Sequence, residues 1–308
     1  MRTTAFVAVA LALSAMKKRT EKTLMAFALA ILVMIPVARA GEDQPTVQQP
    51  KELTLDCGKD VSLKLVLVPA GEFKMGGGEP PEQVAQKCNG LPAKAEWFQN
   101  EQPQHRVKIT RPFYMGVYVV TQAQYEAVMG ANPSFVKGEN NPVEQVSWSD
   151  AVDFCKKLSV KTGQTVRLPT EAEWEYACRA GTTTPFNTGE TISTDQANYN
   201  GNFTYGSGIT GEYRQKTVAV GSFAPNAWGL YDMHGNVWEW CEDWYDAGYY
   251  KNSPTDDPPG PEKGESRVLR GGAWNSDSRN YRSAVRVRGF PGNRLKSVGF
   301  RVVCAPRP

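Results

Sequence analysis

The segment Gly229–Trp240, with the sequence GLYDMHGNVWEW, says most about the fold of this chain. Its acidic residues Asp232 and Glu239 are seven positions apart, with a glycine and an asparagine between them. Two carboxylates on a tight loop that also offers backbone carbonyls supply the oxygen ligands that Ca²⁺ prefers. The alternative is a structural turn that buries Trp238 and Trp240. The spacing alone favours this turn, because the segment is not a standard calcium loop.

Three helices are predicted upstream of this segment from the residues that cap them. Each begins after a serine or threonine whose side chain can accept a hydrogen bond from the first helical turn. Two of them also have an acidic residue three positions after the cap, and two end at a glycine. The predicted helices begin after Thr121, Ser147 and Thr170 and cover residues 122–129, 148–158 and 171–180.

Short strands are predicted on both sides of these helices. The clearest is 63–68, where LKLVLV is followed by a Pro-Ala-Gly turn. Residues 41–56 are polar and indicate a linker, and residues 77–104 indicate an insertion loop. Long Gly-, Asn- and Trp-rich stretches in the last third contain few helix signals, so the fold class is α+β with much irregular structure. The other predicted strands are 73–76, 217–220, 267–269 and 299–303.

The N-terminus carries the three-part pattern of a secretory signal peptide. A basic stretch begins at Lys17, an apolar run covers 24–38, and Ala38-Arg39-Ala40 matches a cleavage site. A membrane anchor is the alternative, but the run is short for a span. The start at Met1 or Met16 stays open. Without residues 1–40, which hold six basic and one acidic side chain, the net charge falls from +3 to −2, so no nucleic-acid surface is implied.

Six motifs occur in an order that resembles the formylglycine-generating enzyme family, also called the sulfatase-modifying factors. The resemblance covers residues 63–306 and implies a C-type-lectin-like α+β fold with little regular secondary structure. We therefore expect a signal peptide at 1–40, a linker and lead-in at 41–62, and the family domain at 63–308. The motifs are LVLVPAGEFKM at 65–75, Val120-Thr121, RLPTEAEWEY at 167–176, GLYDMHGNVWEW at 229–240, LRGGAW at 269–274, and Gly299-Phe300-Arg301.

The resemblance implies two calcium sites. At the first of them, the resemblance favours calcium over a structural turn without a metal. The family commonly has Asn at the first position of the first site and Asp at the position of Glu212. The first site would use the side chains of Asp232 and Glu239 and the carbonyls of Met233, Gly235 and Val237. The second would use the side chains of Asn198 and Glu212 and the carbonyls of Tyr199 and Arg214.

The same resemblance places the catalytic residues of the family. Formylglycine-generating enzymes use two cysteines between their Gly-Gly-Ser and Gly-Phe-Arg motifs, whose thiolates bind Cu(I) and activate oxygen to oxidise a substrate cysteine. The nearest equivalents here are Ser276 and Ser278, and Ala273 replaces the family serine. Because a hydroxyl does not replace a thiolate as a Cu(I) ligand, the sequence predicts no formylglycine-generating activity and no catalytic residues of that kind.

The chain has six cysteines, which an exported protein usually oxidises into disulfides. Their spacing alone leaves the connectivity open. The resemblance implies a Cys155–Cys304 bridge. Cys178 is left to pair with Cys241 or to stay free, and a redox role for Cys241 is a further alternative. The remaining two, Cys57 and Cys88, are available to clip the N-terminal loop.

The stretch that replaces the catalytic cysteines is the predicted ligand groove. Its arginines, with Arg286 and Arg288, could bind an acidic or peptide ligand. Structural salt bridges are the favoured alternative, since the resemblance places Arg282, Arg286 and Arg301 at family positions that are often buried. His105 and His234 are expected to be structural. The groove candidates are Trp274, Ser276, Ser278, Arg279, Tyr281 and Arg282.

These patterns predict an exported, calcium-stabilised binding module for a peptide, protein or glycan, periplasmic or secreted and of bacterial type. No nucleic-acid partner and no stable membrane insertion after signal cleavage are expected. The alternative is a divergent enzyme of the same family that modifies a non-sulfatase substrate, for example in siderophore maturation. Two histidines are too few for the branch with a three-histidine iron site.

Overall fold

The N-terminal hairpin opens the larger of the two main sheets, and all strand pairs in this sheet are antiparallel. The computed structural model describes residues 50–90 and 92–306, so the predicted signal peptide and both candidate start positions lie outside it. The sheet has the order β1-β2-β6-β13-β7, with β13 inserted between β6 and β7. Its strands are β1 (Glu52–Gly58), β2 (Val61–Val68), β6 (Phe113–Gly116), β7 (Val166–Arg167) and β13 (Val303–Cys304).

Strand β1 lies inside the stretch that was expected to be linker and lead-in, residues 41–62. Glu52–Gly58 pairs with β2 along its whole length. Leu55 and Cys57 alternate with exposed polar residues and point into the core. The strand was missed because Glu52, Thr54 and Asp56 make it look polar overall, whereas only one face is exposed.

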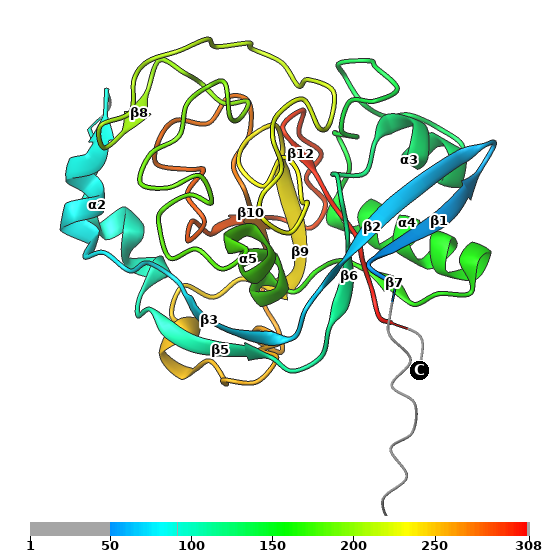
Figure 1. Cartoon of the computed structure of the whole chain (residues 1–308), viewed down its shortest axis with the longest axis horizontal. Helices are drawn as coiled ribbons and strands as arrows, with labels where there is room; N and C mark the ends of the chain where they lie inside the picture. Colours follow the sequence, from blue (N-terminus) through cyan, green and yellow to red (C-terminus); the bar gives the residue numbers. More distant parts are fainter. Residues whose placement is uncertain (1–49, 91, 307–308) are drawn as a thin grey trace, which may run out of the picture. The chain divides into compact units, whose positions relative to one another are not determined.

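The predicted helices are confirmed at their capped ends. They are α3 (Gln122–Met129), α4 (Trp148–Thr162) and α5 (Glu171–Arg179), and each begins with a capping box in which side chain and backbone bond reciprocally. Helix α4 runs four residues beyond the prediction, to a left-handed glycine at Gly163. Helices α3 and α4 pack beside the β1–β2 hairpin (Figure 1). This packing forms a core around Leu65, Phe154 and Phe300.

A second sheet of order β11-β10-β9-β12 brings the last third of the chain together. Trp240 on β9 faces Leu269 on β10 and is fully buried. Helix α5 lies against β9 and β10, and all of its residues are buried (Figure 1). The strands are β9 (Trp238–Trp244), β10 (Arg267–Arg270), β11 (Val287–Gly289) and β12 (Val298–Gly299).

Three expectations about local structure were wrong. Residues 77–104 were expected to be a loop, but they contain α2 (Pro81–Lys87), β4 (Cys88–Asn89) and the 3-10 helix η1 (Ala95–Glu101). Residues 217–220 form no strand. The predicted strand 299–303 is split between β12 and β13, which belong to different sheets. Two further ladders join β3 (Gly71–Met75) to β5 (His105–Ile109) and β4 to β8 (Thr204–Tyr205), and η2 covers Tyr249–Asn252.

A buried ionic network ties α5 to the second sheet. Glu175 accepts hydrogen bonds from Arg179 and Arg270, and Glu171 is bridged bidentately by Arg286. All five side chains are at least 95% buried. The two arginines beside Glu175 hold the pKa of its carboxyl below the usual range despite its burial. The network fixes how the last third of the chain packs on α5.

All six cysteines are buried, and the described residues contain no disulfide bond. The predicted Cys155–Cys304 bridge therefore stays a prediction, although both sulfurs lie in the same core cluster. Burial raises the pKa of Cys57 and Cys88 to about 11 and that of Cys178 to about 12. These side chains are therefore thiols, not thiolates, at neutral pH.

Candidate functional site

The first predicted calcium site lies at the start of β9, between two buried carboxyl groups. Glu239 accepts hydrogen bonds from Arg301 (Nε–Oε2 2.6 Å, Nη2–Oε1 2.8 Å) and from Trp174 (Nε1–Oε2 2.8 Å). Its charge is therefore already balanced. Asp232 accepts only the Gly221 amide among the contacts described, and burial raises its pKa to about 6. A cation beside Asp232 would supply the missing positive charge.

The second predicted site adjoins the first, because Asn198 forms a bridge to Gly235 and accepts the Asn236 amide at 2.7 Å. Asn198 Oδ1 is buried and has no hydrogen-bond partner in the described part of the chain, which fits a cation ligand. Glu212 fits less well, since its carboxylate is exposed and paired with Arg214 at 3.1 Å.

The other predicted ligands of these sites are backbone carbonyls, at buried positions except for Arg214. Tyr199, Met233 and Val237 have buried side chains, and Gly235 adopts a positive φ of 82°. Within the described residues, no group of three or more His, Cys, Asp or Glu side chains converges as a metal site. The two predicted sites together would use three carboxylates and one side-chain amide.

The two serines that stand nearest to the family's catalytic cysteine positions are buried. Ser276 Oγ accepts the Ala273 amide at 2.9 Å, and the Ser276 carbonyl accepts the Asn200 amide at 3.0 Å. Ser278 is only 2% exposed. The Ser276 hydroxyl stabilises a tight turn, and the two hydroxyls are not presented to solvent as a reactive pair.

The predicted ligand groove is mostly closed. Trp274, Ser276, Ser278, Tyr281 and Arg282 are all less than one tenth exposed. The expected alternative of structural salt bridges is confirmed for three arginines, because Arg282 binds Glu101 (2.7 and 2.8 Å), Arg286 binds Glu171 and Arg301 binds Glu239. Arg279 is held by Asp277 and lies over the half-exposed ring of Trp97.

His234 is a structural residue, as predicted. Its Nδ1 donates to the Tyr281 carbonyl (2.7 Å) and its Nε2 accepts the Asn187 amide (3.1 Å), an arrangement that requires the neutral ring. Burial lowers its pKa to about 4. Cys178 Sγ lies 3.8 Å from Nε2, but as a buried thiol it has no access to a substrate. The pair is a packing contact.

An exposed surface beside the closed groove combines apolar and basic side chains. The loop after β11 is held by backbone hydrogen bonds from Gln145 to Leu295 and from Trp148 to Pro291. It nevertheless exposes Phe290 (62%) and Leu295 (49%), and Lys296 lies 5.7 Å from the ring of Phe135, which is 67% exposed. We call this surface the basic–apolar patch; its members are Phe135, Arg288, Phe290, Arg294, Leu295 and Lys296.

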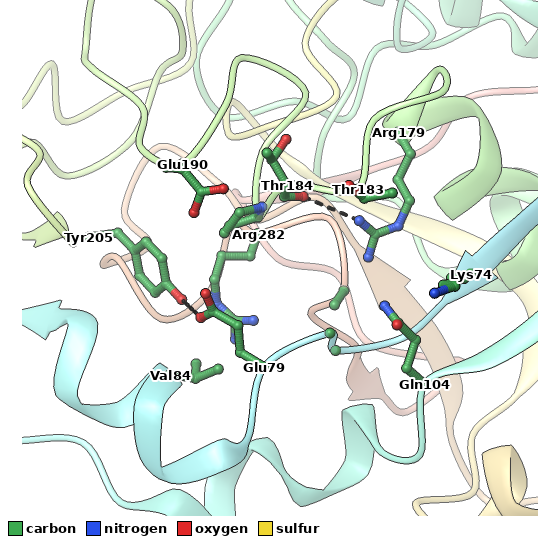
Figure 2. A pocket seen from close by; sticks show the side chains of 14 residues that line it. Lys74, Glu79, Val84, Gln104, Arg179, Thr183, Thr184, Glu190, Tyr205 and Arg282 are labelled. Atoms are coloured by element: carbon green, nitrogen blue, oxygen red, sulfur yellow. Dashed lines mark hydrogen bonds between the residues drawn. The ribbon is translucent and has the colours of Figure 1, made fainter.

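A polar pocket of about 320 Å³ lies on another part of the domain (Figure 2). It is bounded by the turn after β3, the end of α5, the loop that follows α5, and strand β8. Lys74 and Gln104 lie on one side and Glu190 and Tyr205 on the other, as Figure 2 shows. Arg282, a predicted groove residue, lines this pocket.

Residues 57–306 match the sulfatase-modifying factor enzyme 1-like domain. This chain belongs to that family. Formylglycine-generating enzymes resemble it over much of its length: one from Mus musculus is 31% identical, covering 77% of this chain and 74% of that protein. One from Streptomyces coelicolor is 37% identical and covers 59% of this chain, which spans 58% of that relative's length.

Solved structures of this fold agree with the family. The Treponema denticola variable protein 1 has a TM-score of 0.69 at 28% identity, covering 83% of this chain and all of that one. PvdO from Pseudomonas aeruginosa has a TM-score of 0.66 at 30% identity, covering 84% and 99%. The fold class expected from the motifs, the formylglycine-generating-enzyme fold, is thereby confirmed.

Sequence reasoning missed the acidic partners that close the family groove. Glu101 lies in η1, inside the stretch expected to be a loop, and Glu171 lies in α5. The only local signal was the number of arginines between 279 and 301, which requires acidic partners if the side chains are buried. The basic–apolar patch was also missed, because Phe135 and Lys296 are far apart in sequence.

Proposed function

We propose that this member of the sulfatase-modifying factor family is an exported, calcium-braced binding domain without formylglycine-generating activity. Its partner is an acidic segment of another protein, which docks on the basic–apolar patch. This places the contact on the exposed loop next to the predicted groove, since the groove residues themselves are buried.

The proposal rests on the apolar side chains of the patch, which are exposed although the loop that carries them is held in place by hydrogen bonds. Phe290 and Leu295 stand on a loop that is hydrogen-bonded to the start of α4, so their exposure is built into the backbone. Exposed apolar side chains gathered on one surface typically mark an interaction site. Arg288 and Lys296 are exposed and form no salt bridge with the described residues, whereas Arg294 is paired with Asp150 at 2.8 Å. The charge therefore selects an acidic partner.

The state of the cysteines supports the absence of formylglycine-generating activity. The family reaction needs accessible thiolates, whereas Cys88 and Cys178 are buried thiols of raised pKa. The hydroxyls of Ser276 and Ser278 cannot take over Cu(I) ligation. We expect no conversion of a cysteine peptide derived from a sulfatase, even with added copper.

We propose that calcium stabilises the fold and takes no part in a reaction. Asp232 and Asn198 are the side chains whose unmet charge and unmet acceptor suit a cation. Glu239, Met233, Gly235 and Val237 would complete the first site, and Tyr199, Glu212 and Arg214 the second. The ions would join residues 198–214 to the start of β9.

Selection from a phage library of random 12-residue peptides tests the docking site. We expect enriched peptides that combine Asp or Glu with aromatic or aliphatic residues, and an affinity that falls with added salt. Phe290→Ser should abolish the enrichment. Val160→Ser is the matched control, because Val160 is 87% exposed but lies on α4 outside the patch. Enrichment that survives Phe290→Ser, or binding of neutral glycans on an array through this surface, would overturn the proposal.

A divergent enzyme acting on a non-sulfatase substrate is the second candidate, and the polar pocket favours it. Elemental analysis of the purified protein separates the two. Calcium near one or two ions per chain, without copper or iron, supports the binding domain. Stoichiometric copper or iron would support the enzyme.

A further inference from the structure

The polar pocket is rigid because most of its charged walls are neutralised inside the protein. Arg179 is paired with Glu175 (2.8 Å) and Arg282 with Glu101 (2.7 Å). Glu79 is bound by Lys87 and by the hydroxyl of Tyr205. These bonds hold the side chains in place before any ligand arrives.

Two charges in the pocket are left without a partner. Lys74 and Glu190 are exposed, and neither side chain makes an ion pair or hydrogen bond with the described residues. They lie on opposite sides of the pocket, with Arg282 and Thr184 between them (Figure 2). The pocket thus offers a cation at one side and an anion at the other.

The overall charge of the pocket argues against a simple anion or cation as ligand. The lining residues and their direct partners contain four acidic and four basic side chains, so the local net charge is zero. A polyanion would meet Glu190 and Glu79, and a polycation would meet Lys74. A ligand with one charge of each sign matches both free groups.

Neutral donors complete the recognition surface. The Gln104 amide lies beside Lys74, and Thr183 faces the same space as Arg179 (Figure 2). The volume, about 320 Å³, lies at the lower end of small-molecule pockets, ~300–1,000 Å³.

From this arrangement we infer that the pocket binds a short peptide by its two charged ends, which are far enough apart to reach both walls. The ligand carboxylate faces Lys74 and Gln104, and its ammonium group faces Glu190. The inference is independent of the basic–apolar patch, since the pocket shares no residue with it.

Calorimetric titration of the full chain with L-alanyl-L-alanine and with tri- and tetra-L-alanine tests the inference. The best ligand is then compared with its N-acetyl form, which lacks the positive charge, and its amide, which lacks the negative charge. We expect each blocked form to bind at least tenfold more weakly. The absence of any binding among these probes would overturn the inference.

Charge variants assign the two ends of the ligand. Glu190→Gln should lower the affinity for the unblocked ligand about tenfold, so that it binds no better than the N-acetyl form. Lys74→Gln should likewise lower this affinity about tenfold, so that the unblocked ligand binds no better than the amide. Glu52→Gln and Lys64→Gln are matched controls, since both residues are exposed on the β1–β2 hairpin. Melting temperatures should stay the same in all four variants. If the N-acetyl form and the amide form lost the same affinity in every variant, the assigned orientation and the site would be refuted.

Discussion

Replacing Glu175 by Gln removes the negative charge between two buried arginines. Glu175 is fully buried, lies 2.8 Å from Arg179, accepts the Gly76 amide at 2.9 Å and is bound by Arg270. The variant keeps the shape of the side chain but leaves two guanidinium groups facing a neutral amide. Breaking a buried pair in this way costs about 3–5 kcal/mol.

Thermal unfolding followed by tryptophan fluorescence measures this loss. For a domain of this size each kcal/mol lowers the melting temperature by about 2–4 °C, so a fall of roughly 6–20 °C is expected. Glu72→Gln is the control, because Glu72 binds Arg106 with equally short distances but both side chains are largely exposed. If Glu175→Gln destabilised the protein no more than Glu72→Gln, the network would not hold α5 in place.

Three further perturbations follow from buried groups. Because the folded-state pKa of Asp232 is raised to about 6, the folded state without calcium loses stability as pH rises from about 4 to 6. Asp232→Asn should therefore stabilise the EDTA-treated protein at pH 7 by on the order of 2 kcal/mol. It should also remove the increase in stability that added calcium gives; an equal increase in both proteins would contradict this. The lowered pKa of His234 has the opposite effect, so the folded state loses stability as pH falls from about 6.5 to 4. His234→Asn should reduce this dependence of the melting temperature on pH. A thiol reagent should label no cysteine of the folded, reduced protein quickly, and six after unfolding; rapid labelling of the folded protein would contradict the burial. Four labelled cysteines in an unfolded, unreduced sample would reveal one disulfide, and peptide mapping of the unlabelled pair would test whether it is Cys155–Cys304.

The helices could be predicted because their signals are local. Thr121, Ser147 and Thr170 bond within the first turn that follows them, so three or four neighbouring residues decide where each helix begins. Strand β1 and the split between β12 and β13 depend instead on pairing partners elsewhere in the chain. A short sequence window contains no information about those partners.

The candidate site, too, could be predicted only where its signals are local in the sequence. The motif around Asp232 and Glu239 could be found from sequence, but not that Arg301 already neutralises Glu239. Arg282 meets an acidic partner 181 positions away, which turns a predicted ligand group into part of the wall of a pocket. Burial and pairing, not residue type, decided which charged side chains remain free.

The position of β13 has a consequence for how the protein is made. Val303 and Cys304 fill the gap between β6 and β7 in the larger sheet, so neither neighbour has its full set of backbone hydrogen bonds until these residues arrive. The larger sheet therefore cannot close before residue 304 is available, wherever the chain folds. A frameshift or stop codon upstream of Val303 would leave a molecule with two open strand edges.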